Sequence, residues 1–429
     1  MWLILYFLIV IIVGFYSFKK VKNNNDFFIA GKKAGIFQVS GSLLASILGS
    51  SAILGSVEFA YNKGYAGSSM MICGSIGLFI LYFLVKYIKD FTGYNLPNML
   101  GGFYGKEVEK ISSLVISIAW IGIVASQIIG AAKIVTILSS FDYTQGVLIS
   151  GGVFILYTLL GGQLSIIKTD FIQFLFIISG VILTFIFVMK QPITIKPLPF
   201  INEKFKITDF IVMLLTYSTT FFVGPDIYSR LFCAKDEKTM KKSIIIAILI
   251  LLPLSFMLAR IGIYGAEHFS KEVLGTNSVL LMIAHTKLSK FIAFALYFGL
   301  LSAVISSADT TLLTSSSLAA QIFIKDLKDK RAIKITRILI VIFGVLSILI
   351  ALKMKYILPT LFMALAVYSG AFIVPVLAGM FGYRGSKKKV FLAILVGGLV
   401  SFIGKIIGGD VGNIVSISAF FLNGILLYV

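Results

Sequence analysis

Charged residues, cysteine and histidine are scarce in this sequence. Asp, Glu, Lys and Arg make up 13% of its 429 residues, about half the share found in ordinary soluble domains. The 2 cysteines have no CxxC partner, and the 2 histidines lack metal-ligand spacing. The scarcity of charge excludes an ordinary soluble domain. The few cysteines and histidines argue against a disulfide framework and against a metal site built from those residues.

The sequence also lacks the features that enzymes and channels need. The apolar stretches contain no metal-ligand cluster and no nucleophile–base pair, which argues against a membrane enzyme. They contain no filter-like repeat and no ring-forming run of charge, which disfavours a channel. Every loop is short, so no soluble signalling domain is evident.

Long apolar runs dominate the chain. Hydrophobic residues make up 58% of it, in runs of roughly 17 to 25 residues, the length that crosses a bilayer as a helix. A β-barrel is excluded because barrel strands are shorter and alternate apolar with polar residues. We therefore expect an all-α polytopic membrane protein with about 13 transmembrane helices. The expected spans are residues 2–18, 36–60, 67–88, 112–138, 146–161, 170–189, 208–228, 242–264, 290–317, 334–352, 356–381, 389–406 and 411–429.

The charge of the chain is strongly positive, with 38 Lys and Arg against 18 Asp and Glu. These cations gather in alternate loops, which is the positive-inside pattern and not a nucleic-acid patch. The basic loops are residues 19–33, 86–110, 230–242, 325–337 and 384–389, together with Lys168. The pattern predicts that the N-terminus lies outside and the C-terminus in the cytoplasm. We expect the membrane to be the plasma membrane of a bacterium or archaeon. We expect the lipid bilayer and a small solute as partners, with no nucleic acid and no obligate protein partner.

The N-terminal segment starts with apolar residues at once. It has neither a basic leader region nor a small-residue cleavage site, so we expect a retained first span and not a cleaved signal peptide.

Two of the expected spans have unusual interiors. Glycine and serine crowd residues 40–56, and residues 216–220 are hydroxyl-rich and precede Gly224 and Pro225. Such residues weaken a helix and can free backbone carbonyls for a cation, although small residues also allow close helix packing. Interrupted helices at matching places in two halves point to an inverted-repeat transporter. We expect one transporter domain, 1–429, with repeats at about 36–189 and 208–381.

A carboxylate lies inside the ninth expected span. Ser306, Asp309 and Thr310 share one helix face, and a charge at membrane depth is costly unless it binds something. Hydroxyl and carboxylate oxygens suit a hard cation such as sodium. Asp170, which opens the sixth span, fits either a helix N-cap or an ion path.

Two further polar residues lie within expected spans. Gln127 fits either a solute contact or a bond between helices. Tyr217 fits either the wall of a polar pocket or ordinary packing.

Several motifs resemble those of the sodium:solute symporter family, in the family's order and over nearly the whole chain. They are residues 26–32 (DFFIAGK), 94–97 (YNLP), 103–105 (FYG), 161–165 (GGQLS), 169–173 (TDFIQ), 224–230 (GPDIYSR), 303–311 (AVISSADTT) and 315–317 (SSS). The resemblance implies a LeuT-type fold of five plus five helices, with one extra N-terminal and two extra C-terminal helices. It also implies sodium as the coupling ion and no organic cofactor.

The resemblance carries site residues over position by position. The positions that match the shared sodium site are Ala45, Leu48, Ala303, Ser306 and Ser307. The positions that match a second cation site, present in some members, are Asp170, Ser306, Asp309 and Thr310. The positions that match the lining of the solute cavity are Ser50, Ser51, Gln127, Tyr217 and Phe221.

Three positions depart from the family pattern. Asp309 stands where some members have serine, which favours either a stronger second cation site or a protonatable group. Ile47 and Ser51 replace an aspartate and a tryptophan of proline-carrying members, which argues against proline as the solute.

We expect sodium-coupled uptake of an amino acid, sugar, carboxylate or vitamin-like solute by alternating access. A proton-coupled carrier of the same fold and a non-transporting membrane sensor are the alternatives.

Overall fold

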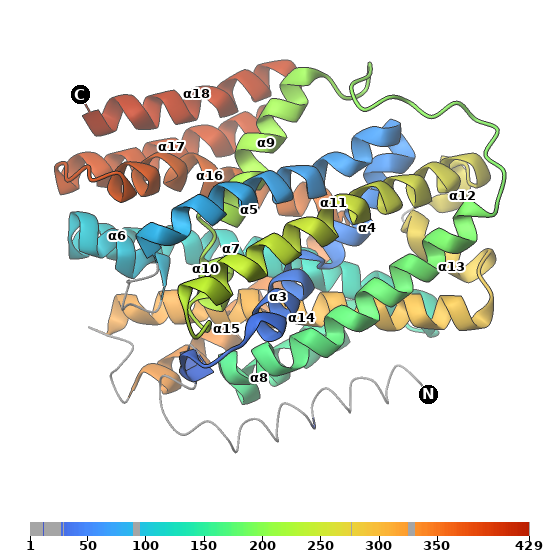
Figure 1. Cartoon of the computed structure of the whole chain (residues 1–429), viewed down its shortest axis with the longest axis horizontal. Helices are drawn as coiled ribbons and strands as arrows, with labels where there is room; N and C mark the ends of the chain where they lie inside the picture. The colour runs from blue at the N-terminus through green and yellow to red at the C-terminus, as the bar shows by residue number, and fades with distance from the viewer. Residues whose placement is uncertain are drawn as a thin grey trace.

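The computed structural model describes residues 12, 27–28, 30–88, 95–275, 277–324 and 331–428, which form a bundle of long helices (Figure 1). Within these residues no named strand occurs, and 2 isolated bridges pair Ala34 with Ala234 and Asn202 with Phe205. The helices are α3 (Ile36–Ile47), α4 (Ser50–Lys63), α5 (Ser69–Ile88), α6 (Leu96–Tyr104), α7 (Lys106–Leu138), α8 (Tyr143–Met189), α9 (Ile207–Phe222), α10 (Pro225–Leu231), α11 (Glu237–His268), α12 (Lys271–Leu274), α13 (Val279–Thr286), α14 (Lys290–Phe323), α15 (Ala332–Lys353), α16 (Ile357–Met380), α17 (Lys387–Ile407) and α18 (Gly409–Tyr428), with short 3-10 turns at Ala30–Lys32 and Gly64–Ser68.

In the described part of the chain, 11 segments are long and apolar enough to cross a membrane. They correspond to the expected spans from the third to the thirteenth. The expected first span, 2–18, lies outside the described residues except for residue 12. The expected second span is split, and its latter part is continuous with the third in one segment, Ser50–Ile88. An all-helical membrane protein is therefore confirmed for the described residues, whereas the number 13 is not.

The expected second span is interrupted at its middle. Helix α3 ends at Ile47, Leu48 has ψ 41°, and Gly49 is extended with ψ 177° before α4 begins. Glycine and serine, which weaken helices, surround this point. The sequence prediction that glycine and serine weaken the helix within residues 40–56 is confirmed.

The expected seventh span is interrupted as well. Helix α9 ends at Phe222, Gly224 has ψ 128°, and α10 starts with Pro225 at its first position. Proline suits that position because it needs no backbone N–H there. The two breaks lie near each other in the bundle, since both α3 and α10 contact α14.

Helices α7 and α14 form the centre of the bundle. They pack against each other, and α14 also packs along α8. In α8 the chain bends at Gly162, whose φ of 56° is a conformation that favours glycine. Helices α17 and α18 lie along one edge of the bundle and α8 along the opposite edge (Figure 1). The buried middle of α14 thus faces elements from both halves of the sequence.

Candidate functional site

The break between α3 and α4 is completed by side chains from two other helices. The Ser307 hydroxyl, on α14, donates to the Ser46 carbonyl at 2.8 Å. The Ser50 N–H, which would bond that carbonyl in a continuous helix, donates instead to Gln127 Oε1 at 2.9 Å. The Ser50 hydroxyl donates to the same oxygen at 2.7 Å. Two backbone groups freed by the break, the Ser46 carbonyl and the Ser50 N–H, are therefore paired, as burial requires.

A cluster of buried charges lies beside this break. The Ser306 hydroxyl donates to Asp170 Oδ1 at 2.6 Å, and the Ser42 hydroxyl donates to Asp170 Oδ2. Asp170 is fully buried inside α8 and receives these bonds from α14 and α3. Of the two sequence interpretations of Asp170, the structure contradicts the N-cap, because Asp170 lies inside α8.

Arg230 was placed in a basic loop by the sequence pattern, and that prediction is wrong. It lies in α10 with no exposed surface. Its Nη2 donates to the Thr310 hydroxyl at 2.5 Å and lies 3.5 Å from Asp170 Oδ2. Its Nε donates to the Ser42 carbonyl at 3.0 Å. A guanidinium offers several donors in a fixed fork, so Arg230 connects α10 to α3, α8 and α14.

Asp309 completes the charged cluster. Its Oδ1 accepts the Thr310 N–H at 2.6 Å, while Oδ2 is buried and accepts no hydrogen bond from the described residues. Asp170, Asp309 and Arg230 together leave one negative charge uncompensated if both carboxylates are ionised. Uncompensated buried charge is strongly unfavourable, so the donor set fits a bound cation or a proton at Asp309.

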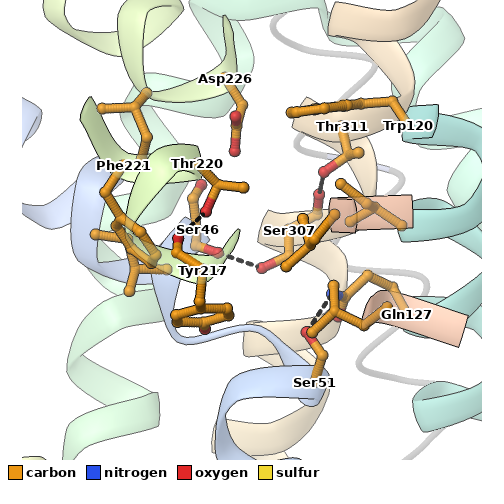
Figure 2. A pocket seen from close by; sticks show the side chains of 15 residues that line it. Ser46, Ser51, Trp120, Gln127, Tyr217, Thr220, Phe221, Asp226, Ser307 and Thr311 are labelled. Atoms are coloured by element: carbon orange, nitrogen blue, oxygen red, sulfur yellow. Dashed lines mark hydrogen bonds between the residues drawn. The ribbon is translucent and has the colours of Figure 1, made fainter. Parts of the chain in front are cut away.

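A cavity of about 70 Å³ lies between the two breaks. It has room for several water-sized groups, since one water needs roughly 10 to 15 Å³ on this measure. Figure 2 shows Ser307 and Thr311 of α14 on one side of the cavity, with Tyr217, Thr220 and Phe221 of α9 opposite. The lining residues are Ser46, Ile47, Ser51, Trp120, Ile123, Gln127, Tyr217, Thr220, Phe221, Asp226, Ile227, Ser307, Thr311, Leu361 and Leu365.

The structure places most of the site residues expected from sequence around this cavity and the charged cluster. Ser51, Gln127, Tyr217 and Phe221 line the cavity, whereas Ser50 bonds Gln127 and is not among the lining residues. Gln127 also donates to the Ser51 hydroxyl at 3.1 Å, so it bonds between helices and faces the cavity as well.

The two serines expected at the main sodium site, Ser306 and Ser307, point to different neighbours. Ser307 faces the break, where Ala45 and Leu48 lie fully buried. Ser306 turns to Asp170, and Ala303 lies on the same buried stretch of α14. All four residues expected at the second site, Asp170, Ser306, Asp309 and Thr310, belong to the charged cluster through the bonds described above.

Sequence reasoning missed several residues of the site, among them Ser42, Asp226 and Arg230. Asp226 and Arg230 are four residues apart in the motif GPDIYSR, so a helical interpretation of that motif puts them on one face. Ser42 gave no comparable signal, because serine is frequent throughout its span.

Comparisons with known proteins give the family. The model of the sodium:solute symporter family matches residues 27–397. The osmoregulated proline transporter OpuE of Bacillus subtilis (strain 168) is 23% identical over 425 residues, covering 92% of this chain and 86% of that protein. The sodium/proline symporter of Haemophilus influenzae (strain ATCC 51907 / DSM 11121 / KW20 / Rd) is 24% identical over 433 residues, with the same coverage of 92% and 86%.

Solved structures show the same fold. A Na+-coupled sialic acid symporter in a substrate-bound outward-open state superimposes with a TM-score of 0.77 at 16% identity, covering 98% of this chain and 96% of that one. A nucleobase-cation-symport-1 family transporter, closed around bromovinylhydantoin, gives a TM-score of 0.60 at 14% identity, covering 93% of each chain. These neighbours are transporters of the LeuT-like fold. Since its family model spans most of the sequence, the chain belongs to the sodium:solute symporter family, and its function is sodium-coupled symport of a small solute.

Proposed function

We propose that the chain carries a small organic solute into the cytoplasm together with sodium by alternating access. The proposal assigns a single transporter domain, 1–429, with inverted repeats at about 36–189 and 208–381 and the extra helices outside them. The interrupted helices α3/α4 and α9/α10 support it, because each begins one of these blocks. The basic loops support an external N-terminus and a cytoplasmic C-terminus in a plasma membrane.

The proposed main sodium site lies at the first break. Its ligands are the carbonyls of Ala45, Leu48 and Ala303 and the hydroxyls of Ser306 and Ser307. One observation supports this most strongly: the Ser307 hydroxyl lies 2.8 Å from a carbonyl freed by the break. Carbonyl and hydroxyl oxygens are the donors that a hard cation prefers. A small rotation of Ser307 exchanges its donated hydrogen bond for a lone pair offered to the ion.

The proposed second cation site is the charged cluster. Asp170, Ser306, Asp309 and Thr310 supply its oxygens, and Arg230 holds Thr310 and Asp170 in place. Sodium there compensates the excess negative charge. A proton on Asp309 is the second candidate, favoured by the buried Oδ2 that accepts no hydrogen bond from the described residues.

The proposed solute site is the cavity between the breaks. Ser51, Gln127, Tyr217 and Phe221 line it, and Ser50 supports it from behind through Gln127. Proline is the solute named for the relatives, and the lining of this cavity differs from theirs. Ile47 is part of the lining, where proline carriers of the family place an aspartate.

Sodium-driven uptake by the purified full chain tests these proposals. In proteoliposomes with an imposed sodium gradient, we expect a radiolabelled amino acid, sugar, sialic acid or pantothenate to accumulate above its external concentration. If accumulation does not depend on sodium and is abolished by an uncoupler, the coupling ion is the proton. Absence of sodium-dependent uptake across the whole panel would falsify the proposal.

Variants of the two ion sites sharpen the test. Ser306→Ala and Asp309→Asn should each raise the sodium concentration for half-maximal uptake, and Asp309→Asn should also lower the Hill coefficient for sodium if a second ion binds there. Ser418→Ala on α18 is a matched control, because its hydroxyl bonds the carbonyl of Val415 in its own helix. An unchanged sodium response in Asp309→Asn, together with lost pH dependence, would assign a proton to that position.

A further inference from the structure

Asp226 brings a charge to the wall of the central cavity. Among the lining residues, all of which belong to the described chain, it is the one with an ionisable carboxylate, and none carries a cationic side chain. It follows Pro225 in the first turn of α10. Figure 2 shows its carboxylate directed into the space between α9 and α14, at the same end of the cavity as Trp120.

The Asp226 carboxylate has unused acceptor capacity. Its Oδ1 is buried and accepts no hydrogen bond from the described residues. Arg230, four residues further along α10, directs its Nη2 to Thr310 and Asp170. Its Nη1 donates to the backbone carbonyl of Asp226 at 3.2 Å and not to the carboxylate. The Arg230 guanidinium thus acts on the Asp226 carboxylate through its charge, while its hydrogen bonds go to other groups.

A role in helix stability does not account for this residue. An acidic side chain in a first turn interacts favourably with the helix dipole, but that effect is small. Enclosing a carboxylate costs far more unless a positive partner is present. With the buried Asp170 and Asp309, the partly buried Asp226 makes three carboxylates around a single guanidinium. A cation in the charged cluster compensates one excess charge, which leaves the charge at the cavity wall.

The other groups around the cavity suit a nitrogen cation. Hydroxyls of Thr220 and Thr311 offer acceptors beside the carboxylate, and the rings of Trp120, Tyr217 and Phe221 form apolar walls. Aromatic faces attract cations and hydroxyls accept hydrogen bonds from an ammonium group. The cavity therefore combines a carboxylate with hydroxyl and aromatic groups that can contact a small organic cation.

We infer that the transported solute carries a protonated amine and that Asp226 pairs with it. This inference rests on the proposed role of the cavity as the solute site. It makes Asp226 a specificity-determining residue that selects the ammonium group, whether or not the solute also carries a carboxylate. The chemical class is thus a small amine or amino acid, as opposed to a neutral sugar or a simple carboxylate.

Sodium-driven uptake into proteoliposomes tests the inference with four small radiolabelled probes. Alanine carries an ammonium and a carboxylate group, ethanolamine only an ammonium group, lactate only a carboxylate group, and glycerol neither. We expect uptake of alanine, ethanolamine or both, and none of lactate or glycerol. Uptake of alanine alone would add a requirement for the carboxylate. Uptake of lactate or glycerol would overturn the inference while leaving the proposed symport intact. Uptake of none of the four probes by a protein that does accumulate a neutral or purely anionic solute of the wider panel would overturn the inference and leave the proposed symport intact.

Variants separate solute recognition from ion binding. Asp226→Asn should raise the concentration of the accepted amine for half-maximal uptake by about 30-fold or more, as expected for losing one partner of an enclosed charge pair. The sodium concentration for half-maximal uptake should stay unchanged. The inference would be contradicted if Asp226→Asn left the affinity for the amine unchanged. It would also be contradicted if the variant weakened only the dependence of uptake on sodium. Asp236→Asn, which removes an exposed carboxylate, is the matched control. If Asp226→Asn fails to fold, selectivity of the wild-type protein across the four probes decides the question.

Discussion

The two interrupted helices are completed by different kinds of side chain. At the first break, the Ser46 carbonyl meets the hydroxyl of Ser307 on α14. At the second break, the Phe222 carbonyl accepts the Tyr228 hydroxyl at 2.7 Å, and the Val223 carbonyl accepts the hydroxyl of Tyr368 on α16. Serine at the first break is small and mobile, whereas the tyrosines at the second are large, rigid and fully buried.

This difference separates two roles that the similar backbones do not reveal. A serine hydroxyl can rotate to make way for an ion, whereas a packed tyrosine ring cannot move without opening the core. The first break is therefore suited to exchange of ligands and the second to holding Asp226 and Arg230 at fixed positions. Matching interrupted helices need not have matching functions.

The largest expected effect comes from the residue that joins the two breaks. Arg230→Met leaves Asp170 and Asp309 enclosed without their guanidinium, and we expect the free energy of unfolding to fall by about 3 to 5 kcal/mol. Thermal unfolding of the purified protein in detergent measures it. Arg384→Met, which removes an exposed arginine, should have little effect. Equal stability of Arg230→Met and the wild type would show that Arg230 does not connect the breaks energetically.

The second effect concerns the two glycines at the breaks. A Cβ at Gly224 would lie 1.8 Å from the Thr220 carbonyl oxygen, which is backbone. A Cβ at Gly49 would lie 2.5 Å from the hydroxyl oxygen and 2.9 Å from the Cβ of Ser307, both of which are side-chain atoms. Gly224→Ala should therefore lose about 3 kcal/mol of stability, while Gly49→Ala should fold and bind sodium more weakly. Similar melting temperatures for the two variants would remove the distinction between a rigid and an adjustable break.

Removing a tyrosine hydroxyl should destabilise the protein without changing its use of sodium. Tyr368→Phe leaves the buried Val223 carbonyl without its partner, and we expect a loss of about 1 to 3 kcal/mol. Melting temperature and the sodium dependence of uptake are measured on the same preparation. Tyr356→Phe, at an exposed position, serves as the control. A changed sodium response in Tyr368→Phe would mean that the second break also binds an ion.

The smallest free-energy change should produce the clearest functional signal. Ser307→Ala removes one proposed sodium ligand, and we expect about a tenfold increase in the sodium concentration for half-maximal uptake, equivalent to about 1.4 kcal/mol. Its melting temperature should stay close to that of the wild type. If Ser307→Ala lowered the melting temperature but left the sodium concentration for half-maximal uptake unchanged, the proposed difference between the two breaks would be wrong.

Local features of the sequence were sufficient to predict both breaks. Glycine, serine and proline at residues 40–56 and 216–225 act on their own helix, so a single sequence shows them. The positions of Asp309 and Asp170 within expected spans marked both residues, and the family resemblance added Ser307. It predicted no hydrogen-bond partner for any of them, because the partners come from other helices.

The ion pair between Asp170 and Arg230 illustrates what the sequence could not show. The two residues are 60 positions apart, and the run of cations after Arg230 suggested a loop. Their contact depends on how α8, α10 and α14 pack, which periodicity along one helix does not determine. The cavity likewise combines residues from several helices, so its single carboxylate became visible only in three dimensions.

The hydrogen bonds around Gly49 also have a mechanical consequence. On one side, α3 is tied to α8, α10 and α14 through Ser42 and Ser46. On the other side, α4 is tied to α7 through Gln127. If α14 and its partners moved relative to α7, α3 would move with α14 and α4 with α7, so the angle between α3 and α4 would change. Most of that change would be taken up by the backbone dihedral angles of Leu48 and Gly49. A spectroscopic reporter group at these residues would therefore show the conformational change of the transport cycle most directly.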